Sequence, residues 1–376
     1  MRYFLTSLVL VIAGTANAAN GPDGVPIEEN FQSCNNLDCG AAVVSKFHTD
    51  KHVLTGNTVF GETFYTEDGG SNFVRTMFPP KKIRMVYNPA NGQVFKPMVD
   101  YIPTKEGIKL TPGSAIKRAP RGYSQEITDS DRENYGVRVA TGFQDFQYAI
   151  TYGKTKTFAP KAIGNLGGFR RAVGSVPLSI TFFGDSITAG ANATSIYAAP
   201  NQPGYTGLVM AYLNNRYPSM FESRNNAVGG WSSINAVSAV EYRVNDKKSD
   251  LVVLAFGMND GGVFAPGEYK KNMQTVITAI RAKQPRVPIL LVSPLRANPL
   301  TFTQKRSNVT GYLPVLKELA KQNPSVAIAD MTSAWDMMMA RKNYLDVSGN
   351  GLNHPNDFGH RILAEVVLSA MLGPNY

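Results

Sequence analysis

The chain of 376 residues is 43% hydrophobic and 18% charged, which is typical of a folded globular protein and excludes a disordered chain. Its length exceeds the usual size of one domain, so we expect two domains whose core needs neither a metal nor a disulfide. The formal net charge of +10 is diffuse. Its densest clusters, at residues 81–84 and 117–121, lack the length and the aromatic residues of a nucleic-acid-binding arm, so nucleic acid is not an expected partner.

Residues 1–18 have the pattern of a secretory signal peptide. Arg2 provides a basic start, residues 4–13 are largely apolar, and Ala16 and Ala18 form an Ala-x-Ala cleavage site. We therefore expect cleavage after Ala18 and a secreted or periplasmic protein. The apolar run is too short to span a bilayer, and no later stretch approaches the ~20 apolar residues that a membrane helix requires, so no membrane span is expected.

Residues 19–45 are polar and rich in turn-forming residues, which predicts an irregular lead-in. This stretch holds both cysteines of the chain, Cys34 and Cys39. In an exported protein a local disulfide between them is favoured over free thiols. Two cysteines without an adjacent pair of histidines are an incomplete ligand set, so no metal site is expected here.

Residues 46–165 predict a small all-β domain with a sandwich-like form. The stretch consists of short β-prone runs broken by Gly, Pro, Asn and Asp, and several runs alternate apolar and polar residues as half-buried antiparallel strands do. No convincing helical stripe appears. The clearest strand candidates are residues 52–54, 73–78, 83–87, 136–140 and 146–152. A glycine-containing linker is expected at 159–174.

Residues 175–376 predict an α/β domain, because apolar strand-like runs now alternate with helix-length amphipathic segments. Five strands connected in this way indicate a flavodoxin-like, doubly wound parallel sheet covered on both faces, with the site at its carboxyl edge. The expected strands are residues 178–183, 221–226, 251–256, 288–292 and 326–329, and the expected helices are 204–216, 268–283, 311–322 and 358–371.

Four short motifs in this domain carry the candidate chemistry. The first three follow predicted strands: Gly184-Asp185-Ser186, then Asn226 to Gly230, then Gly257-Met258-Asn259-Asp260. The fourth, Asn353-His354-Pro355-Asn356-Asp357-Phe358-Gly359-His360, opens the final helix. A serine at a strand end is a candidate nucleophile, which needs a base within hydrogen-bonding reach, and glycine N–H groups and an asparagine amide are candidate oxyanion donors.

In this order the motifs resemble the four blocks of the SGNH (GDSL-like) hydrolases, and the resemblance covers about residues 176–372. It implies that Ser186 is the nucleophile, that His354 is the general base and acid, and that His360 is a structural residue. It also implies an oxyanion hole made by the Ser186 N–H, Gly230 and Asn259. Gly229 is the alternative to Gly230 if the turn is shifted by one residue.

The chain departs from the family pattern at the third member of the catalytic triad. The position three residues before the histidine, where the family usually has an aspartate, holds Gly351. A backbone carbonyl from residues 350–352 could orient the ring in a Ser-His dyad, as in some carbohydrate esterases that pair a β-sandwich with an SGNH domain. We favour that dyad slightly, with Asp346 as the second choice, whereas Asp357 is more simply explained as the N-cap of the last helix.

The resemblance thus implies a serine ester hydrolase that works through an acyl-enzyme without a cofactor or a metal, and the signal-peptide pattern predicts that it is exported. Export, the additional β domain and the basic charge point to O-acetyl groups on a polysaccharide or cell-wall glycan as the substrate. The alternatives are a lipid or short-chain acyl esterase of the same family, a catalytically inactive glycan-binding protein, and an O-acetyltransferase. The sequence carries no signal for the oligomeric state.

Overall fold

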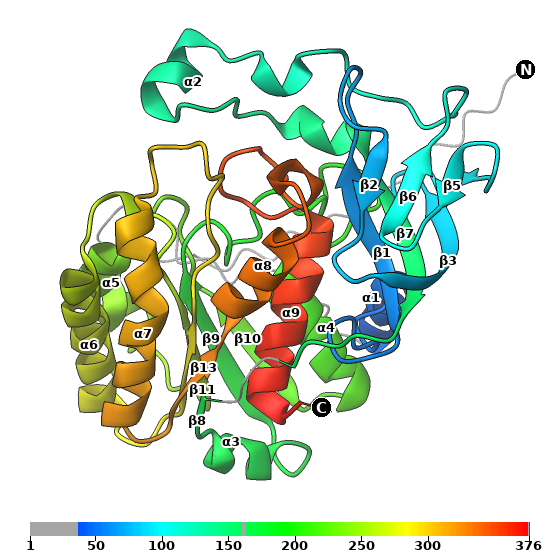
Figure 1. Ribbon diagram of the computed structural model, residues 1–376. Helices are drawn as coiled ribbons and strands as arrows, with labels where there is room; N and C mark the ends of the chain where they lie inside the picture. The colour runs from blue at the N-terminus through cyan, green and yellow to red at the C-terminus, as the bar shows by residue number, and fades with distance from the viewer. Residues whose placement is uncertain (1–36, 160–162, 375) are drawn as a thin grey trace, which may run out of the picture.

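The computed structural model describes residues 37–159, 163–374 and 376 (Figure 1). The expected signal peptide and Cys34 lie outside the described residues, so export and the disulfide remain predictions. Among the helices that are described, none is both long enough and apolar enough to cross a membrane.

The C-terminal part of the chain is built on a six-stranded sheet with the order β10-β9-β11-β12-β13-β8. Its first five strands are parallel, and their order is that of a flavodoxin-like doubly wound sheet. The sequence-based prediction of this fold class is confirmed. The strands are β9 (Leu178–Gly184), β10 (Phe221–Asn225), β11 (Leu251–Ala255), β12 (Ile289–Val292), β13 (Val326–Ala329) and the antiparallel edge strand β8 (Ile163–Gly164).

Helices cover both faces of this sheet. Successive strand residues point to opposite faces, so Phe182 packs in one core cluster and Phe183 in the other. The Phe183 side is covered by α5 (Ser233–Arg243), α6 (Pro266–Lys283) and α7 (Arg306–Gln322) (Figure 1). The Phe182 side is covered by α4 (Tyr205–Arg216), α8 (Met331–Met339) and α9 (Asp357–Leu372). Burial on both faces explains why the strands read as continuous apolar runs.

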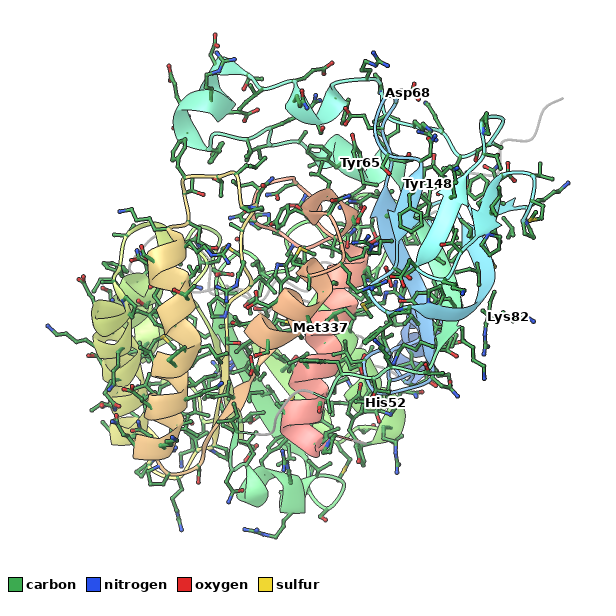
Figure 2. All side chains as sticks on the ribbon, in the orientation of Figure 1. His52, Tyr65, Asp68, Lys82, Tyr148 and Met337 are labelled. Carbon is green, nitrogen blue, oxygen red and sulfur yellow. The ribbon has the colours of Figure 1, made fainter. Side chains whose placement is uncertain are left out.

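The N-terminal part contains two antiparallel sheets, which confirms the predicted all-β domain. One sheet has the order β1-β7-β3-β4 and the other β2-β6-β5. Side chains fill the space between this domain and helices α8 and α9, so the two domains share one apolar core (Figure 2). The strands are β1 (Thr58–Tyr65), β2 (Phe73–Arg75), β3 (Pro80–Tyr87), β4 (Val94–Phe95), β5 (Tyr101–Pro103), β6 (Gly107–Leu110) and β7 (Gln147–Lys154).

The chain before β1 differs from the predicted irregular lead-in. Residues from Leu37 form a helix, α1 (Leu37–Phe47), which contains Cys39. It packs on α4, and Gly40 allows the close approach, because a Cβ at that position would lie 3.2 Å from Ala211 O. The expected lead-in is therefore wrong from Leu37 onward, because burial of Val44 and Phe47 stabilises a short helix that local composition does not favour.

A long excursion of the β domain crosses the carboxyl edge of the parallel sheet. It contains α2 (Asp129–Asn134) and the 3-10 helix η2 (Thr141–Phe146), and it lies above the strand ends in Figure 1. Thr301 Oγ1, in the loop after β12, donates to Tyr135 O at 2.6 Å and fastens the excursion to the α/β domain. The strand predicted at 136–140 falls in this excursion and is a loop, and 52–54 is a turn.

Candidate active site

The first motif forms the turn that follows the central strand β9. Gly184 ends the strand where a side chain has no room, because a Cβ there would lie 2.6 Å from Ala255 O. Asp185 Oδ1 then accepts a hydrogen bond from the Ile187 N–H at 2.9 Å and closes the turn. Ser186 is presented at the carboxyl end of the sheet with 9% of its surface exposed.

His354 lies in the loop between the 3-10 helix η4 (Tyr344–Asp346) and α9. Asn350 shapes this loop, because its Oδ1 accepts hydrogen bonds from the backbone N–H groups of Leu352, Asn353 and His354 at 3.0 to 3.1 Å. The loop brings His354 Nε2 to 2.8 Å from Ser186 Oγ. The structure thus joins the first and fourth motifs, which are 168 residues apart in the sequence.

The other ring nitrogen of His354 is held by Asn192, from the loop that follows the nucleophile. His354 Nδ1 lies 2.7 Å from Asn192 Oδ1. The amide nitrogen of Asn192 faces Gly349 O at 3.4 Å, and a carbonyl can only accept. The amide oxygen therefore faces the ring, so Nδ1 carries the hydrogen and the lone pair of Nε2 is directed at the hydroxyl of Ser186.

This arrangement is that of an activated serine. Burial lowers the pKa of His354 to about 4, so the imidazole is neutral at pH 7 and can accept a proton from Ser186. Asn192 fixes the tautomer as a triad carboxylate would, but its amide carries no charge to stabilise the imidazolium that forms during the reaction. The chemistry that the geometry supports is nucleophilic attack by Ser186 with His354 as base.

A comparison with known protein families assigns the part of the chain that holds these residues to one of them. Residues 182–362 match the model of the GDSL-like Lipase/Acylhydrolase family. This part of the chain is a GDSL-like hydrolase domain. The predicted SGNH resemblance is confirmed, and the domain belongs to a family of ester hydrolases.

Two of the solved structures that are similar to this chain are Axe2 and LAE5. Axe2, an acetylxylan esterase from Geobacillus stearothermophilus, is 20% identical with a TM-score of 0.44, over 52% of this chain and 94% of that one. LAE5, an α/β hydrolase enzyme from the metagenome of Lake Arreo in Spain, is 20% identical with a TM-score of 0.44, over 54% of this chain and 100% of that one. No curated protein matches the sequence.

The second and third motifs of the hydrolase domain lie beside the nucleophile. A Cβ built on Gly229 would be 3.9 Å from the Cβ of Ser186, and Gly230 follows with a φ of 78°. Within the part of the chain that the structure describes, the N–H groups of Ser186, Gly229 and Gly230 have no hydrogen-bond partner. Backbone donors without a partner beside a nucleophile are what an oxyanion requires.

Asn259 lies against the same turn, with its Nδ2 donating to Trp231 O at 2.8 Å. Because a carbonyl only accepts, this bond fixes the orientation of the amide and leaves its second N–H hydrogen for a substrate. Asp260, the next residue, accepts from the N–H of Ser233 at 2.9 Å and also from its hydroxyl, so it holds the start of α5. Burial raises the pKa of Asp260 and raises the pKa of Asp185 to about 7.

Asp346, the second choice for the third member, and Asp357, the expected N-cap of the last helix, both lie elsewhere, and the N-cap of α9 is Asn356. Asp346 Oδ1 accepts from the Tyr65 N–H at 2.8 Å, and its Oδ2 lies 3.4 Å from Lys342 Nζ. The Asp357 carboxylate accepts from the N–H and hydroxyl of Thr194, both at 2.8 Å. Both carboxylates are thus engaged in structural contacts, and the place beside the imidazole belongs to Asn192.

The structure also contradicts the prediction that a backbone carbonyl from residues 350–352 orients the His354 ring. Gly351 O accepts from Asn298 Nδ2 at 2.7 Å, and Asn350 O accepts from the Ala140 N–H at 3.1 Å. Leu352 O accepts from the Asn298 N–H at 2.8 Å. The only signal for Asn192 in the sequence is its position six residues after Ser186, in a loop that leaves the same sheet edge.

His360 supports the loop that carries Asn192. Its Nε2 lies 3.0 Å from Ala191 O, and its Nδ1 accepts from the Tyr205 N–H at 3.2 Å, so one buried ring joins the two ends of the loop. Burial lowers the pKa of His360 to about 4, which keeps the ring neutral with one donor and one acceptor. The structure therefore places His360 in a supporting position, away from Ser186 Oγ.

Proposed function

We propose that the protein is an exported serine ester hydrolase that removes O-acetyl groups from a polysaccharide or cell-wall glycan. The observation that carries the proposal is the hydrogen-bonded chain from Ser186 Oγ to His354 and on to Asn192, which lies beside N–H groups without partners. The family match supports ester hydrolysis. The expected signal peptide and the net charge of +10 favour an extracellular, anionic polymer as the carrier of the acetyl group.

In the proposed reaction, Ser186 Oγ attacks the acetyl carbonyl carbon while His354 Nε2 takes the hydroxyl proton. The developing oxyanion is stabilised by the Ser186 N–H, by an N–H of the Gly229–Gly230 pair and by the Asn259 amide. The bond from the carbonyl carbon to the sugar oxygen then breaks, and His354 returns the proton to that oxygen. Water attacks the acetyl-enzyme with the same residue as base, which releases acetate and restores Ser186.

The test measures acetate release from 4-nitrophenyl acetate and from a panel of acetylated glycans. Wild type is compared with Ser186→Ala and His354→Ala, and we expect each variant to lose roughly three powers of ten or more in kcat, because each removes a group that reacts. Equal, background rates for all three proteins would contradict ester hydrolysis. An acetylated sugar product in place of free acetate would indicate transfer to a glycan acceptor.

A further inference from the structure

The contacts that hold Asn192 extend beyond the hydrolase domain. Asn192 has a φ of 61°, in the left-handed region that asparagine tolerates better than most residues. Its backbone carbonyl accepts a hydrogen bond from Gln144 Nε2 at 2.8 Å. Gln144 belongs to η2, in the excursion of the N-terminal domain just before β7.

Gln144 also lies against the loop that carries His354. A Cβ built on Gly349 would be 2.9 Å from Gln144 Nε2 and 2.5 Å from the Cβ of Asn192, so these three residues pack without spare room. The N–H of Gly349 in turn donates to His354 O at 3.0 Å. The amide of Gln144 therefore lies where the loop that follows Ser186 meets the loop that carries His354.

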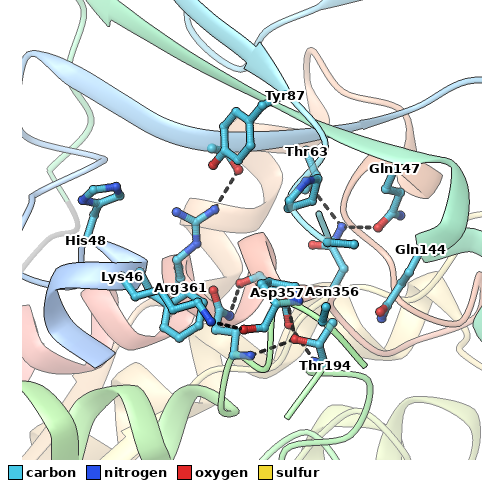
Figure 3. Close-up of a pocket in the computed structure, with 17 residues that line it drawn as sticks. Lys46, His48, Thr63, Tyr87, Gln144, Gln147, Thr194, Asn356, Asp357 and Arg361 are labelled. Atoms are coloured by element: carbon cyan, nitrogen blue, oxygen red, sulfur yellow. Dashed lines mark hydrogen bonds between the residues drawn. The ribbon is translucent and has the colours of Figure 1, made fainter. Parts of the chain in front are cut away.

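The neighbours of Gln144 brace the same loop. Gln147 Nε2 donates to Leu345 O at 2.6 Å and to Ser348 O at 2.8 Å, and its Oε1 accepts from Asn356 Nδ2 at 2.7 Å. In Figure 3, Gln144 and Gln147 lie on the same side of the cavity between the domains, close to Asn356. The Gln144 contact is therefore one of several hydrogen bonds that the N-terminal domain makes to this part of the hydrolase domain.

We propose that Gln144 is a positioning residue of the hydrolase site, supplied by the N-terminal domain. It holds the backbone of Asn192 so that the amide oxygen reaches His354 Nδ1. This inference rests on the proposed function, and it makes the N-terminal domain a working part of the active site. Removal of the amide leaves Asn192 O without its donor and lets the left-handed residue relax, which displaces the oxygen from the ring.

The experiment compares Gln144→Ala and Gln144→Glu with a control, Gln125→Ala, whose exposed side chain lies in the same excursion. We expect both Gln144 variants to lose about tenfold in kcat with little change in KM, because a displaced orienting group weakens the transition state and spares substrate binding. Glutamate cannot donate to Asn192 O, so it should not rescue the activity. The control should match wild type.

A double-mutant cycle separates positioning from general destabilisation. If Gln144 acts through Asn192, then Gln144→Ala adds no further loss to Asn192→Ala. Fully additive losses would overturn the proposal, as would a Gln144→Ala enzyme with wild-type kcat.

A second readout does not depend on turnover. The proton on His354 Nδ1 should give a downfield NMR resonance in wild type that is shifted or lost in Gln144→Ala and retained in Gln125→Ala. An unchanged resonance in Gln144→Ala would overturn the inference. If wild type hydrolyses no ester, the proposed function fails on its own, and this resonance still decides the role of Gln144.

Discussion

At the residue scale, the unusual feature is a neutral partner for His354, the proposed general base. A carboxylate would hold the ring and also attract the positive charge that the ring acquires, whereas Asn192 only holds it. Burial also disfavours the charged form of the His354 ring and so lowers its pKa. The combination makes His354 a weaker base, but the ring stays neutral down to low pH and readily returns its proton to a leaving alcohol.

The pH dependence of kcat/KM tests this combination. The reaction needs neutral His354, whose pKa burial lowers to about 4, so activity should persist as pH falls below 6.5 and disappear only as pH passes through about 4. Asn192→Asp places a negative charge beside the ring and should move this acid limb up by about 1 to 3 pH units. Asn192→Ala should lose roughly two powers of ten or more in kcat, because nothing then selects the tautomer.

The measurement is a pH profile of ester hydrolysis for wild type and both variants, with circular dichroism to confirm folding at each pH. An acid limb near 6.5 in wild type, unchanged in Asn192→Asp, would show that Asn192 does not contact the ring in solution.

At the scale of elements, neighbouring helices hold the strand-end turns that carry the site. Asp260 follows directly after Asn259 and accepts from the first residue of α5, Ser233. The same helix begins after the Gly229–Gly230 turn, so one carboxylate ties the second motif to the third. Gly257, which begins the third motif, has a φ of 131°, and a Cβ at this position would lie 2.8 Å from the ring of Pro294.

Asp260→Ala should therefore destabilise the fold and weaken the oxyanion site together. The buried N–H and hydroxyl of Ser233 lose their acceptor, which costs roughly 1 to 3 kcal/mol in the free energy of unfolding. The control Glu318→Ala breaks an exposed pair with Lys270 and should leave the urea midpoint close to that of wild type. Urea unfolding and kcat are measured for both, and equal stabilities would contradict this role of Asp260.

At the scale of the whole molecule, a buried ionic cluster joins the two domains. Lys342 Nζ, with no exposed side-chain surface, lies 3.0 Å from Glu62 Oε1 in β1 and 3.4 Å from Asp346 Oδ2. Tyr152 in β7 donates to the second oxygen of Glu62 at 2.6 Å. Asp346, which the sequence suggested for catalysis, therefore anchors the hydrolase domain to the β domain.

Lys342→Met should destabilise the whole protein, because it leaves two buried carboxylates without a counter-charge at a cost of roughly 3 to 5 kcal/mol. Since the cluster spans both domains, we expect one cooperative urea transition in wild type that moves to lower urea in the variant. Lys270→Met, in the exposed pair with Glu318, is the matched control and should cost less than about 1 kcal/mol. Separate transitions for the two domains, or equal midpoints for both variants, would contradict this role of the cluster.

Much of the α/β domain follows from local sequence patterns. Strands buried on both faces read as apolar runs, and β13 has the bounds that the pattern predicts. The sequence does not predict helices α5 and α8, because segments of 11 and 9 residues are too short to be stable without tertiary packing. In the β domain, β1 was missed because Gly61 interrupts the run, and its pairing with β7 depends on residues about 90 positions away.

By itself, the sequence determined the α/β class, the hydrolase family and the convergence of the Ser186, Gly229–Gly230 and Asn259 turns, because the carboxyl ends of parallel strands meet at one edge of a sheet. Only the tertiary structure decided what orients His354. Asn192 lies in a loop and Gln144 in the short 3-10 helix η2, and their contacts join residues 162 and 48 positions apart. Such contacts depend on how loops pack against one another, which no local periodicity encodes.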